Sequence, residues 1–337
     1  MGLKLSILDQ SPIAENETAM EAFRHTGRLA QKAEELGFHR FWVSEHHDSK
    51  AVVGSSPEVL ISYLLAKTTR IRIGSGGVML QHYSPFKVAE NFNVLAALAP
   101  GRVDLGIGRA PGGLPRSTRA LQQDGTHGAT SLEEKLVELG HHLHHTLPET
   151  HPLYGVTAVP LADQPADIYM LGTSPSSAEL AARLGLPYVF AQFLNGDDGV
   201  IDEALQAYRA QFQSVNGSRP QAVVALSVIV ADTDEEAEAL AADAKVYKIH
   251  LESGKTINVN SLEAVEEYGR QSREKFTVET KQARVIQGSK ETVRKQILDI
   301  QERYRLEEIM FILAVKGFPY RLHAYELLHD AFAELTV

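Results

Sequence analysis

The sequence predicts a (β/α)₈ barrel, the fold known as the TIM barrel. Short apolar runs rich in β-branched and aromatic residues recur along the chain, and a segment with helical periodicity follows each of them. Strands that alternate with helices pair in parallel through right-handed crossovers. Eight such units suggest a sheet that closes on itself, and the chain of 337 residues falls within the roughly 200 to 400 residues that this barrel occupies.

The expected strands share a short apolar run, and several follow a glycine or a polar turn at the end of the preceding helix, as in LGFHRFWV, TTRIRIGS, PGRVDLGIG and LGLPYVFA. The strand candidates are residues 4–8, 40–44, 71–80, 103–107, 167–171, 188–191, 222–230 and 308–314. The helical candidates are residues 19–36, 57–66, 85–98, 131–144, 176–184, 202–215, 234–249, 291–304 and 319–335.

A doubly wound open sheet is the competing architecture. Such a sheet is expected to carry a glycine-rich nucleotide fingerprint after its first strand, where this chain has Asp9-Gln10-Ser11-Pro12. The motif GIGRAPGG, which begins at Gly106, lacks the third glycine of that fingerprint. No change of composition divides the chain, so we expect a single domain over residues 1–337.

Two stretches are longer than a barrel unit requires. Residues 146–166 contain four prolines and are expected to form an external excursion that packs against the barrel. Residues 252–289 are polar, contain glycine and are only weakly periodic. Long insertions in compact domains often act as lids, so we expect a mobile lid before the eighth strand, with a disordered surface loop as the alternative.

Composition excludes several classes of function. A net charge of −10 and the lack of a basic run argue against a nucleic-acid partner. The chain has no cysteine, which excludes disulfides, thiolate metal sites and a cysteine nucleophile, and fits a reducing compartment. It has no signal-peptide pattern and no stretch near about 18 consecutive apolar residues, so we expect a soluble cytoplasmic protein without a membrane partner.

Four polar or glycine-rich motifs belong to consecutive strands, at the end of the barrel where TIM-barrel enzymes collect their functional residues. Glu45-His46-His47 follows the second strand, and GSGG (residues 74–77) lies within the third. GIGR (residues 106–109) ends the fourth strand, and GTSPSS (residues 172–177) follows the fifth. Each motif alone is weak evidence, but four on one rim indicate a functional site.

Glu45, His46 and His47 suggest either a metal site or an acid/base group. Successive side chains of an extended segment point to opposite faces, so the two histidines should diverge. No second rim motif completes a ligand set, because the remaining cluster lies on an expected helix outside the barrel, at His141, His142, His144 and His145. We therefore expect no metal, and one inward histidine with a neighbouring carboxylate, as a general acid or base or a hydrogen-bond donor.

The segment after the fifth strand could bind a phosphate. Ser174 can cap the following helix, Pro175 suits its first position, and Ser177 adds a hydroxyl among unpaired backbone N–H groups. Such a helix N-terminus attracts phosphate, although ordinary capping explains the same residues. Arg109 could supply the countercharge or could form a structural salt bridge.

Gly76 and Gly77 lie in mid-strand, where glycine weakens a sheet unless a ligand or another backbone must approach closely. A flat aromatic ring against this strand would need that clearance. A tight barrel interior is the competing explanation.

The chain resembles the bacterial luciferase-like flavin-dependent monooxygenases over essentially its full length. The resemblance lies in GFHRFWVSEHHD, IRIGSGGVMLQHYSP, GRVDLGIGRAPGG, SPSSAELAARLGLPY and the C-terminal GSKETVRKQIL. It implies an FMN-dependent monooxygenase that receives reduced FMN from a separate flavin reductase, activates O₂ as a C4a-peroxyflavin and oxygenates a small organic substrate. It also implies a homodimer that forms through the second and third helices.

The resemblance also implies roles for the residues at the matching positions. His46 would be the catalytic residue beside the flavin, with Glu45 and His47 as its supports. The cofactor-binding positions would include a cis peptide held against the flavin ring and a phosphate site, namely Ser75, Gly76, Gly77, Arg109, Thr173, Ser174 and Ser177.

Two positions depart from the luciferase α chains. Gly108 stands where those chains carry a cysteine, and Thr173 stands where they carry an acidic residue. Light emission is therefore not implied, and flavin affinity is expected to differ.

Two other functions share the same barrel. A deazaflavin-dependent oxidoreductase would bind a different reduced cofactor and consume no oxygen. A flavin-binding protein without turnover would need neither His46 nor a long lid, and both count against it. The residues near Gln192 and Phe193 carry no recognisable code, so the organic substrate stays open.

Overall fold

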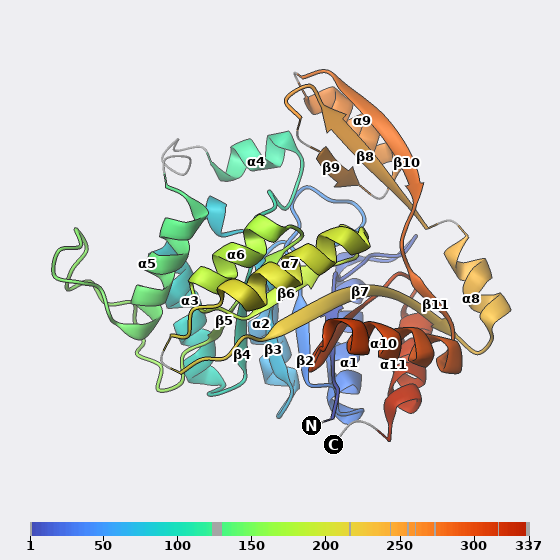
Figure 1. Cartoon of the computed structure of the whole chain (residues 1–337), viewed down its shortest axis with the longest axis horizontal. Helices are drawn as coiled ribbons and strands as arrows, with labels where there is room; N and C mark the ends of the chain where they lie inside the picture. Colours follow the sequence, from blue (N-terminus) through green and yellow to red (C-terminus); the bar gives the residue numbers. More distant parts are fainter. Residues whose placement is uncertain are drawn as a thin grey trace.

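The computed structural model describes residues 2–122, 130–215, 217–242, 244–254, 256–259, 261–272, 274–315 and 317–334. It contains a closed barrel of parallel strands with helices around it (Figure 1). The barrel strands are β1 (Lys4–Asp9), β2 (Arg40–Val43), β3 (Arg72–Val78), β4 (Val103–Ile107), β5 (Asp167–Gly172), β6 (Tyr188–Ala191), β7 (Ala222–Ala231) and β12 (Glu308–Leu313). They pair in this order, and β12 pairs with β1 to close the ring. The predicted (β/α)₈ barrel is confirmed.

The helices begin where the local sequence can satisfy their free backbone N–H groups. Thr18 and Ser131 each form a capping box with the glutamate three residues later, Glu21 and Glu134. The helices around the barrel are α1 (Ala19–Glu35), α2 (Pro57–Lys67), α3 (Pro85–Leu98), α5 (Leu132–His144), α6 (Pro175–Arg183), α7 (Asp198–Gln211), α8 (Asp234–Ala241), α10 (Lys290–Tyr304) and α11 (Phe318–Phe332). The short helix α4 (Pro115–Leu121) lies above the C-terminal ends of the strands. A short 3₁₀ helix, η1 (Leu80–His82), separates β3 from α3.

Side chains fill the barrel interior in layers. Arg40 on β2 forms ion pairs with Asp104 on β4 and Glu308 on β12, each at 2.7 Å. One step further along the strands lies an apolar layer that includes Leu8, Trp42, Tyr169, Leu171 and Met310. Gly74 leaves room between the layers, because a Cβ there would come within 2.6 Å of Trp42 Nε1. A ligand must therefore sit above this filled interior, at the C-terminal ends of the strands.

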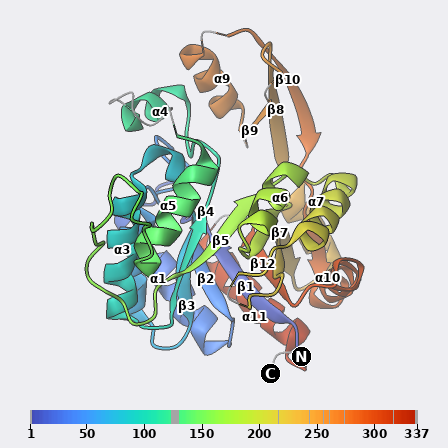
Figure 2. The same ribbon diagram turned by 60° about the vertical axis from the view of Figure 1, so that its left-hand side comes forward.

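A small antiparallel sheet stands above those ends, next to α4 (Figures 1 and 2). It consists of β8 (Lys245–Leu251), β9 (Thr256–Val259) and β10 (Phe276–Gln282) in the order β10-β8-β9, with α9 (Leu262–Gln271) packed on it. The predicted lid, residues 252–289, covers most of this extension, and its mobility stays a prediction. Its last residues form β11 (Ile286–Ser289), which pairs with β7 and so belongs to the barrel sheet.

The predicted helix over residues 234–249 is wrong in its second half. α8 ends at Ala241, and β8 follows. In β8 the buried Tyr247 and Ile249 alternate with the more exposed Lys248 and His250, which is the two-residue period of a strand. We read that short apolar run as a continuation of the helical pattern before it.

The expected excursion, residues 146–166, contains no helix or strand along its fully described length. Its residue Ala158 is completely buried, and Asn93 on α3 donates from Nδ2 to the Ala158 carbonyl at 2.8 Å. The Val159–Pro160 peptide bond is cis. The excursion thus contacts the outer helix layer of the barrel.

The pKa of His39 makes part of the fold pH-dependent. Arg40 Nη2 lies 3.0 Å from His39 Nε2 and can only donate, so the ring accepts there and is neutral. Burial and the charge of Arg40 lower the pKa of His39 to about 4, from 6.5. A depressed folded-state pKa means that the unfolded chain binds the proton first as the pH falls, so the free energy of unfolding decreases from about pH 6.5 towards pH 4.

We expect the His39→Gln variant to lose this pH dependence. Chemical denaturation at pH 7 and pH 4.5 should show a smaller decrease than in the wild type, with a difference of at most about 3 kcal/mol. His144→Gln, at an exposed position on α5, is the control and should keep the wild-type slope. Parallel profiles for His39→Gln and the wild type would contradict the assignment.

Candidate active site

The predicted site residues come from four consecutive barrel strands, and the structure brings their C-terminal ends side by side. Val43 on β2 pairs with Ser75 on β3, and Gly76 on β3 pairs with Gly106 on β4. Ile107 at the end of β4 pairs with Met170 on β5. The segments that follow β2, β4 and β5 therefore lie next to one another on one half of the barrel rim.

The two adjacent histidines have different partners, as their alternation predicts. His46 Nδ1 lies 3.0 Å from the hydroxyl of Ser44, two residues earlier. His47 Nε2 lies 2.7 Å from Glu45 Oε1, also two residues earlier. The two histidines therefore lie on opposite faces of the segment. Ser44 and His46 share one face, and Glu45 and His47 share the other.

Glu45 is completely buried and accepts hydrogen bonds from three groups. Met79 N–H donates to Oε2 at 3.0 Å, and the Tyr83 hydroxyl and His47 Nε2 meet Oε1 at 2.7 Å each. Burial and the charge of Glu45 raise the pKa of Tyr83, so its hydroxyl keeps the proton that it donates. Sequence reasoning missed this role of Tyr83, which lies 38 positions from Glu45 along the chain.

Lys135 on α5 fixes the segment that supplies those donors. Its ammonium donates to the carbonyls of Leu80, Gln81 and Tyr83 at 3.2, 3.1 and 3.0 Å. Burial lowers the pKa of Lys135. The segment around η1 is thus tied both to α5 and to the loop after β2.

His46 is held at its backbone, and its surroundings favour the neutral ring. Its N–H donates to the Gly54 carbonyl at 2.8 Å. Burial lowers the pKa of His46, and the neighbouring His47 lowers it further, while Glu45 acts in the opposite direction. A neutral imidazole carries one N–H donor and one acceptor nitrogen, which suits hydrogen bonding or proton transfer at the rim.

The peptide bond between Gly76 and Gly77 is cis, as the resemblance implied. A Cβ on Gly76 would lie 2.5 Å from Leu8 Cδ1, and one on Gly77 would lie 2.7 Å from the Gly106 carbonyl oxygen. Close packing within the barrel wall therefore accounts for both glycines. Ser75 is completely buried, and its hydroxyl donates to the Gly106 carbonyl at 2.9 Å, so its hydrogen is used within the barrel wall while its predicted cofactor contact stays a prediction.

The N-terminus of α6 has the predicted cap. Ser174 N–H and Ser177 N–H bond reciprocally to the hydroxyls of Ser177 and Ser174. Ser177 is buried, and its hydroxyl donates to the Ser174 carbonyl at 2.7 Å beside the Tyr188 hydroxyl at 2.9 Å, so it too is engaged within the protein. Thr173 is half-buried, and its carbonyl accepts from Asn195 Nδ2 at 3.1 Å.

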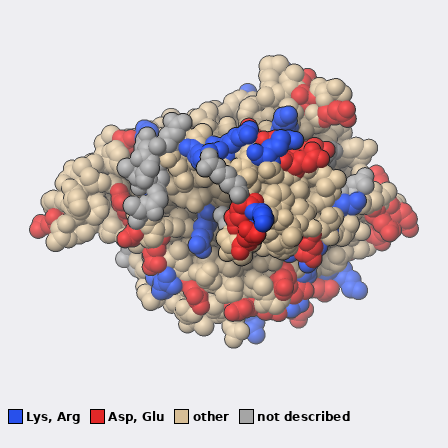
Figure 3. All heavy atoms as spheres, turned by 90° about the horizontal axis from the view of Figure 1, so that it is seen from above, with Lys and Arg blue, Asp and Glu red and all other residues tan. Residues whose placement is uncertain are grey.

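Arg109 is exposed beyond the end of β4, beside the strand that leads into α6. No carboxylate in the described ranges forms an ion pair with it, so the structural salt bridge that we considered is not found there. Figure 3, which looks onto this end of the barrel, shows lysine and arginine side chains here interspersed with aspartate and glutamate. An anionic group beside Arg109 would therefore meet a positive charge that has no ion-pair partner in the described ranges.

The chain matches the family model described as luciferase-like monooxygenase over residues 3–306. It is 43% identical to the N-acetyl-S-alkylcysteine monooxygenase of Bacillus subtilis (strain 168), with 98% of each chain aligned. The solved structure of apo-MsnO8 is 34% identical, covers 99% of both chains and superimposes with a TM-score of 0.80.

This chain belongs to the luciferase-like monooxygenase family. Its enzyme class is that of the flavin-dependent monooxygenases, and the resemblance inferred from the motifs is confirmed. More distant members of the fold differ in cofactor. The oxygenating constituent of 3,6-diketocamphane monooxygenase from Pseudomonas putida, solved in complex with FMN, is 17% identical, covers 100% of this chain and 99% of that one, and has a TM-score of 0.66. An F420-dependent secondary alcohol dehydrogenase is 15% identical, covers 98% and 99%, and has a TM-score of 0.64.

Among the described residues of this luciferase-like monooxygenase, no three His, Asp or Glu side chains lie close enough together to hold a metal ion. None of the described helices is long and apolar enough to cross a membrane. His142, one of the four clustered histidines, is buried in α5 with its ring 5.2 Å from that of Phe86.

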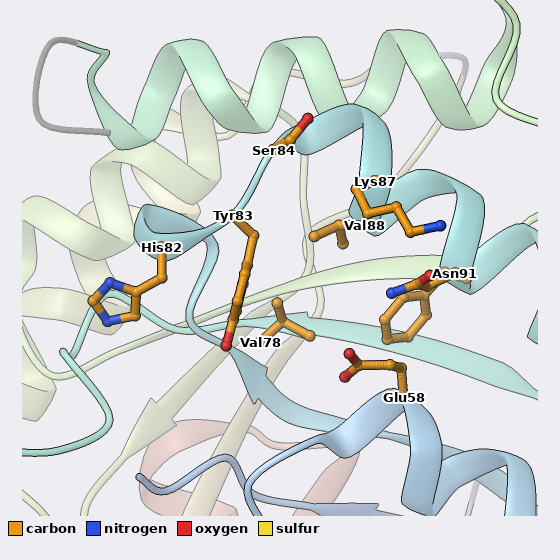
Figure 4. A pocket seen from close by; sticks show the side chains of 9 residues that line it. Glu58, Val78, His82, Tyr83, Ser84, Lys87, Val88 and Asn91 are labelled. Atoms are coloured by element: carbon orange, nitrogen blue, oxygen red, sulfur yellow. The ribbon is translucent and has the colours of Figure 1, made fainter. Parts of the chain in front are cut away.

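A cavity of about 330 Å³ lies behind Tyr83, on the outer side of the barrel (Figure 4). Figure 4 shows Glu58 from α2 and Lys87 and Asn91 from α3 around it. None of the predicted site residues lines this cavity. In this luciferase-like monooxygenase, Tyr83 therefore stands between an outer cavity and the buried Glu45.

Removing one of the three donors to Glu45 tests how much the buried hydrogen bonds of this carboxylate contribute to stability. We expect Tyr83→Phe to lower the free energy of unfolding by about 1.5–3 kcal/mol, because a hydrogen bond to a buried charge is lost without a change of shape. Urea denaturation measures this change. Tyr154→Phe, at a residue 56% exposed on the excursion, should stay within about 0.5 kcal/mol of the wild type. Equal effects of the two substitutions would refute the role given to Tyr83.

Proposed function

We propose that this protein is an FMN-dependent monooxygenase that receives reduced FMN from a separate flavin reductase and uses O₂ to oxygenate a small organic substrate. The observation that carries the proposal is the unpaired Arg109 beside the capped N-terminus of α6, on the same half of the rim as His46. Reduced FMN would supply the redox chemistry, which is addition of O₂ at the flavin C4a and delivery of one oxygen atom to the substrate.

The phosphate of FMN would lie at the N-terminus of α6. Backbone N–H groups and the helix dipole favour an anion there, and Arg109 adds a charge-assisted contact. Thr173 and Ser174 border this position. The hydroxyl of Ser177 is engaged with Ser174 and Tyr188, so Ser177 supports the cradle from beneath.

His46 would act at the reacting edge of the flavin. Its neutral ring can donate a hydrogen bond to a developing negative charge or transfer a proton to it. Glu45 and His47 do not face the same side, and they act by fixing the loop that carries His46.

The small sheet above the rim would exclude water during the reaction. It already has contacts on two sides of the rim. Asn258 on β9 donates to the Leu194 carbonyl at 2.7 Å, and Gln271 on α9 accepts from Arg116 N–H at 2.9 Å. Exclusion of bulk water protects a reactive oxygen carrier from wasteful breakdown.

Two aspects of the proposal go further than the cofactor. Because one relative is named for N-acetyl-S-alkylcysteines, thioethers of this kind are the first substrates that we would test.

We also infer a homodimer that forms through α2 and α3. These helices expose four large apolar side chains, namely Val59, Tyr63, Val94 and Leu98.

An anaerobic titration with reduced FMN, followed by admission of air, tests the cofactor and the chemistry together. We expect saturable binding and then a long-lived absorbance band that belongs to neither reduced nor oxidised FMN. His46→Ala should shorten the life of that band while it changes FMN affinity by no more than about threefold, since His46 is placed away from the phosphate. Failure to bind reduced FMN would end the proposal. Binding of a reduced deazaflavin without oxygen consumption would establish the deazaflavin alternative in its place.

The phosphate site makes a separate prediction. Arg109→Gln should weaken binding of reduced FMN by about 10-fold to 100-fold, because one charge-assisted hydrogen bond to phosphate is lost. The affinity for riboflavin, which has no phosphate, should not change. Arg119→Gln on α4, also an exposed arginine at this end of the barrel, is the matched control and should leave both affinities intact. An equal loss for FMN and riboflavin would place Arg109 elsewhere in the site.

A further inference from the structure

Ser44 occupies a position that no motif singled out. It follows β2 directly, is only 5% exposed, and its N–H donates to the Asp9 carbonyl at 3.1 Å. Because side chains alternate along extended backbone, Ser44 shares a face with Trp42, which belongs to the apolar layer of the barrel interior. Its hydroxyl lies 3.0 Å from His46 Nδ1.

The hydroxyl of Ser44 has one polar partner within the described residues, and that partner is the ring of His46. Two other buried serines, both on barrel strands, donate their hydroxyl hydrogen to a nearby oxygen. Ser75 donates to the Gly106 carbonyl and Ser6 to the Glu308 carboxylate. Ser44 has no such oxygen acceptor in the described chain, so Nδ1 is the group that can take its hydrogen.

Hydrogen bonds fix the backbone around His46, so the orientation and tautomer of its ring depend on the contacts of the ring itself. His46 N–H is held by the Gly54 carbonyl, and the buried Glu45 side chain holds the preceding residue. Burial lowers the pKa of His46, so the ring is neutral near pH 7 and carries a single proton. A nitrogen that accepts a hydrogen bond cannot carry that proton.

We propose that Ser44 is a positioning residue that donates to His46 Nδ1 and so fixes the Nε2–H tautomer of His46. Nε2, on the side of the ring away from Ser44, is then always the donor. The catalytic consequence rests on the proposed function, because it assumes that His46 meets an oxygen-bearing group at the rim. The tautomer itself is a property of the protein alone.

The tautomer can be read without a cofactor. Uniform ¹⁵N labelling of the 14 histidines, with long-range ¹H–¹⁵N correlation spectra at neutral pH, distinguishes protonated from unprotonated ring nitrogens. A spectrum of His46→Gln identifies the signals of His46 by their loss. We expect Nδ1 of His46 to be unprotonated in the wild type. In Ser44→Ala a population with protonated Nδ1 should appear, and Ser44→Thr should remove it again because threonine restores the hydroxyl.

A matched variant separates this effect from general loosening. Ser11→Ala removes the hydroxyl of a serine that is 1% exposed, whose carbonyl accepts from Val53 N–H beside Gly54 at 3.0 Å and whose hydroxyl accepts from Thr26. It should leave the His46 signals unchanged. A protonated Nδ1 in the wild type would overturn the proposal, and so would His46 signals in Ser44→Ala that match those of the wild type.

Enzyme activity provides a second readout, and it tests the catalytic consequence of the tautomer separately from the tautomer itself. Once a substrate is in hand, Ser44→Ala should lower kcat by up to about tenfold, the value of one hydrogen bond, with little change in the affinity for reduced FMN. Ser44→Thr should recover most of the loss. If reduced FMN does not bind at all, the proposed function fails, while the spectra of the free protein still decide the tautomer.

Discussion

The buried carboxylate of Glu45 is the constraint on which the arrangement of this site depends. A charge without contact with water costs several kcal/mol unless its lone pairs are occupied. Here Met79 N–H, the Tyr83 hydroxyl and His47 occupy them, and the first two come from the segment between β3 and α3. The loop after β2 is therefore tied to the segment after β3, and Lys135 ties that segment to α5. The position of His46 depends on this connected set of polar contacts, since Glu45 is its neighbour in the chain.

Glycines allow the strands of the barrel wall below this rim to pack closely against one another and against the interior side chains. Gly74 and Gly76 on β3 would clash with Trp42 and Leu8 if they carried a Cβ, and Gly106 on β4 would clash with the backbone of Ser75. Large side chains of β1 and β2 thus fill the interior opposite small residues of β3 and β4. This division lets side chains fill the interior while β3 and β4 approach each other closely. The place for a ligand is therefore above the wall, where the loops after β2, β4 and β5 meet.

Much of this architecture follows from local patterns. All eight barrel strands were predicted close to their observed bounds, because a strand between two helical segments is recognisable over a few residues. β8 was missed because its alternation of Tyr247 and Ile249 with polar residues is short and follows a real helix. The partnership of Tyr83 with Glu45 could not be predicted, since it joins two loops through the closure of the barrel. The outward direction of the Ser75 side chain could have been predicted. A Cβ on Gly74 or Gly76 would face the barrel interior, and the side chain of the residue between them must face the opposite way.

The same two-residue period sorts the side chains of the segment after β2 onto two faces. Ser44 and His46 share the inner face, while Glu45 and His47 share the outer face and form part of the buried network. A shift of the strand by one residue would turn His47 to the inner face and move the carboxylate of Glu45 away from its three donors. Since Glu45 needs its three donors, this shift is strongly disfavoured. The cost of leaving a carboxylate unpaired thus decides which of the two adjacent histidines lies on the inner face.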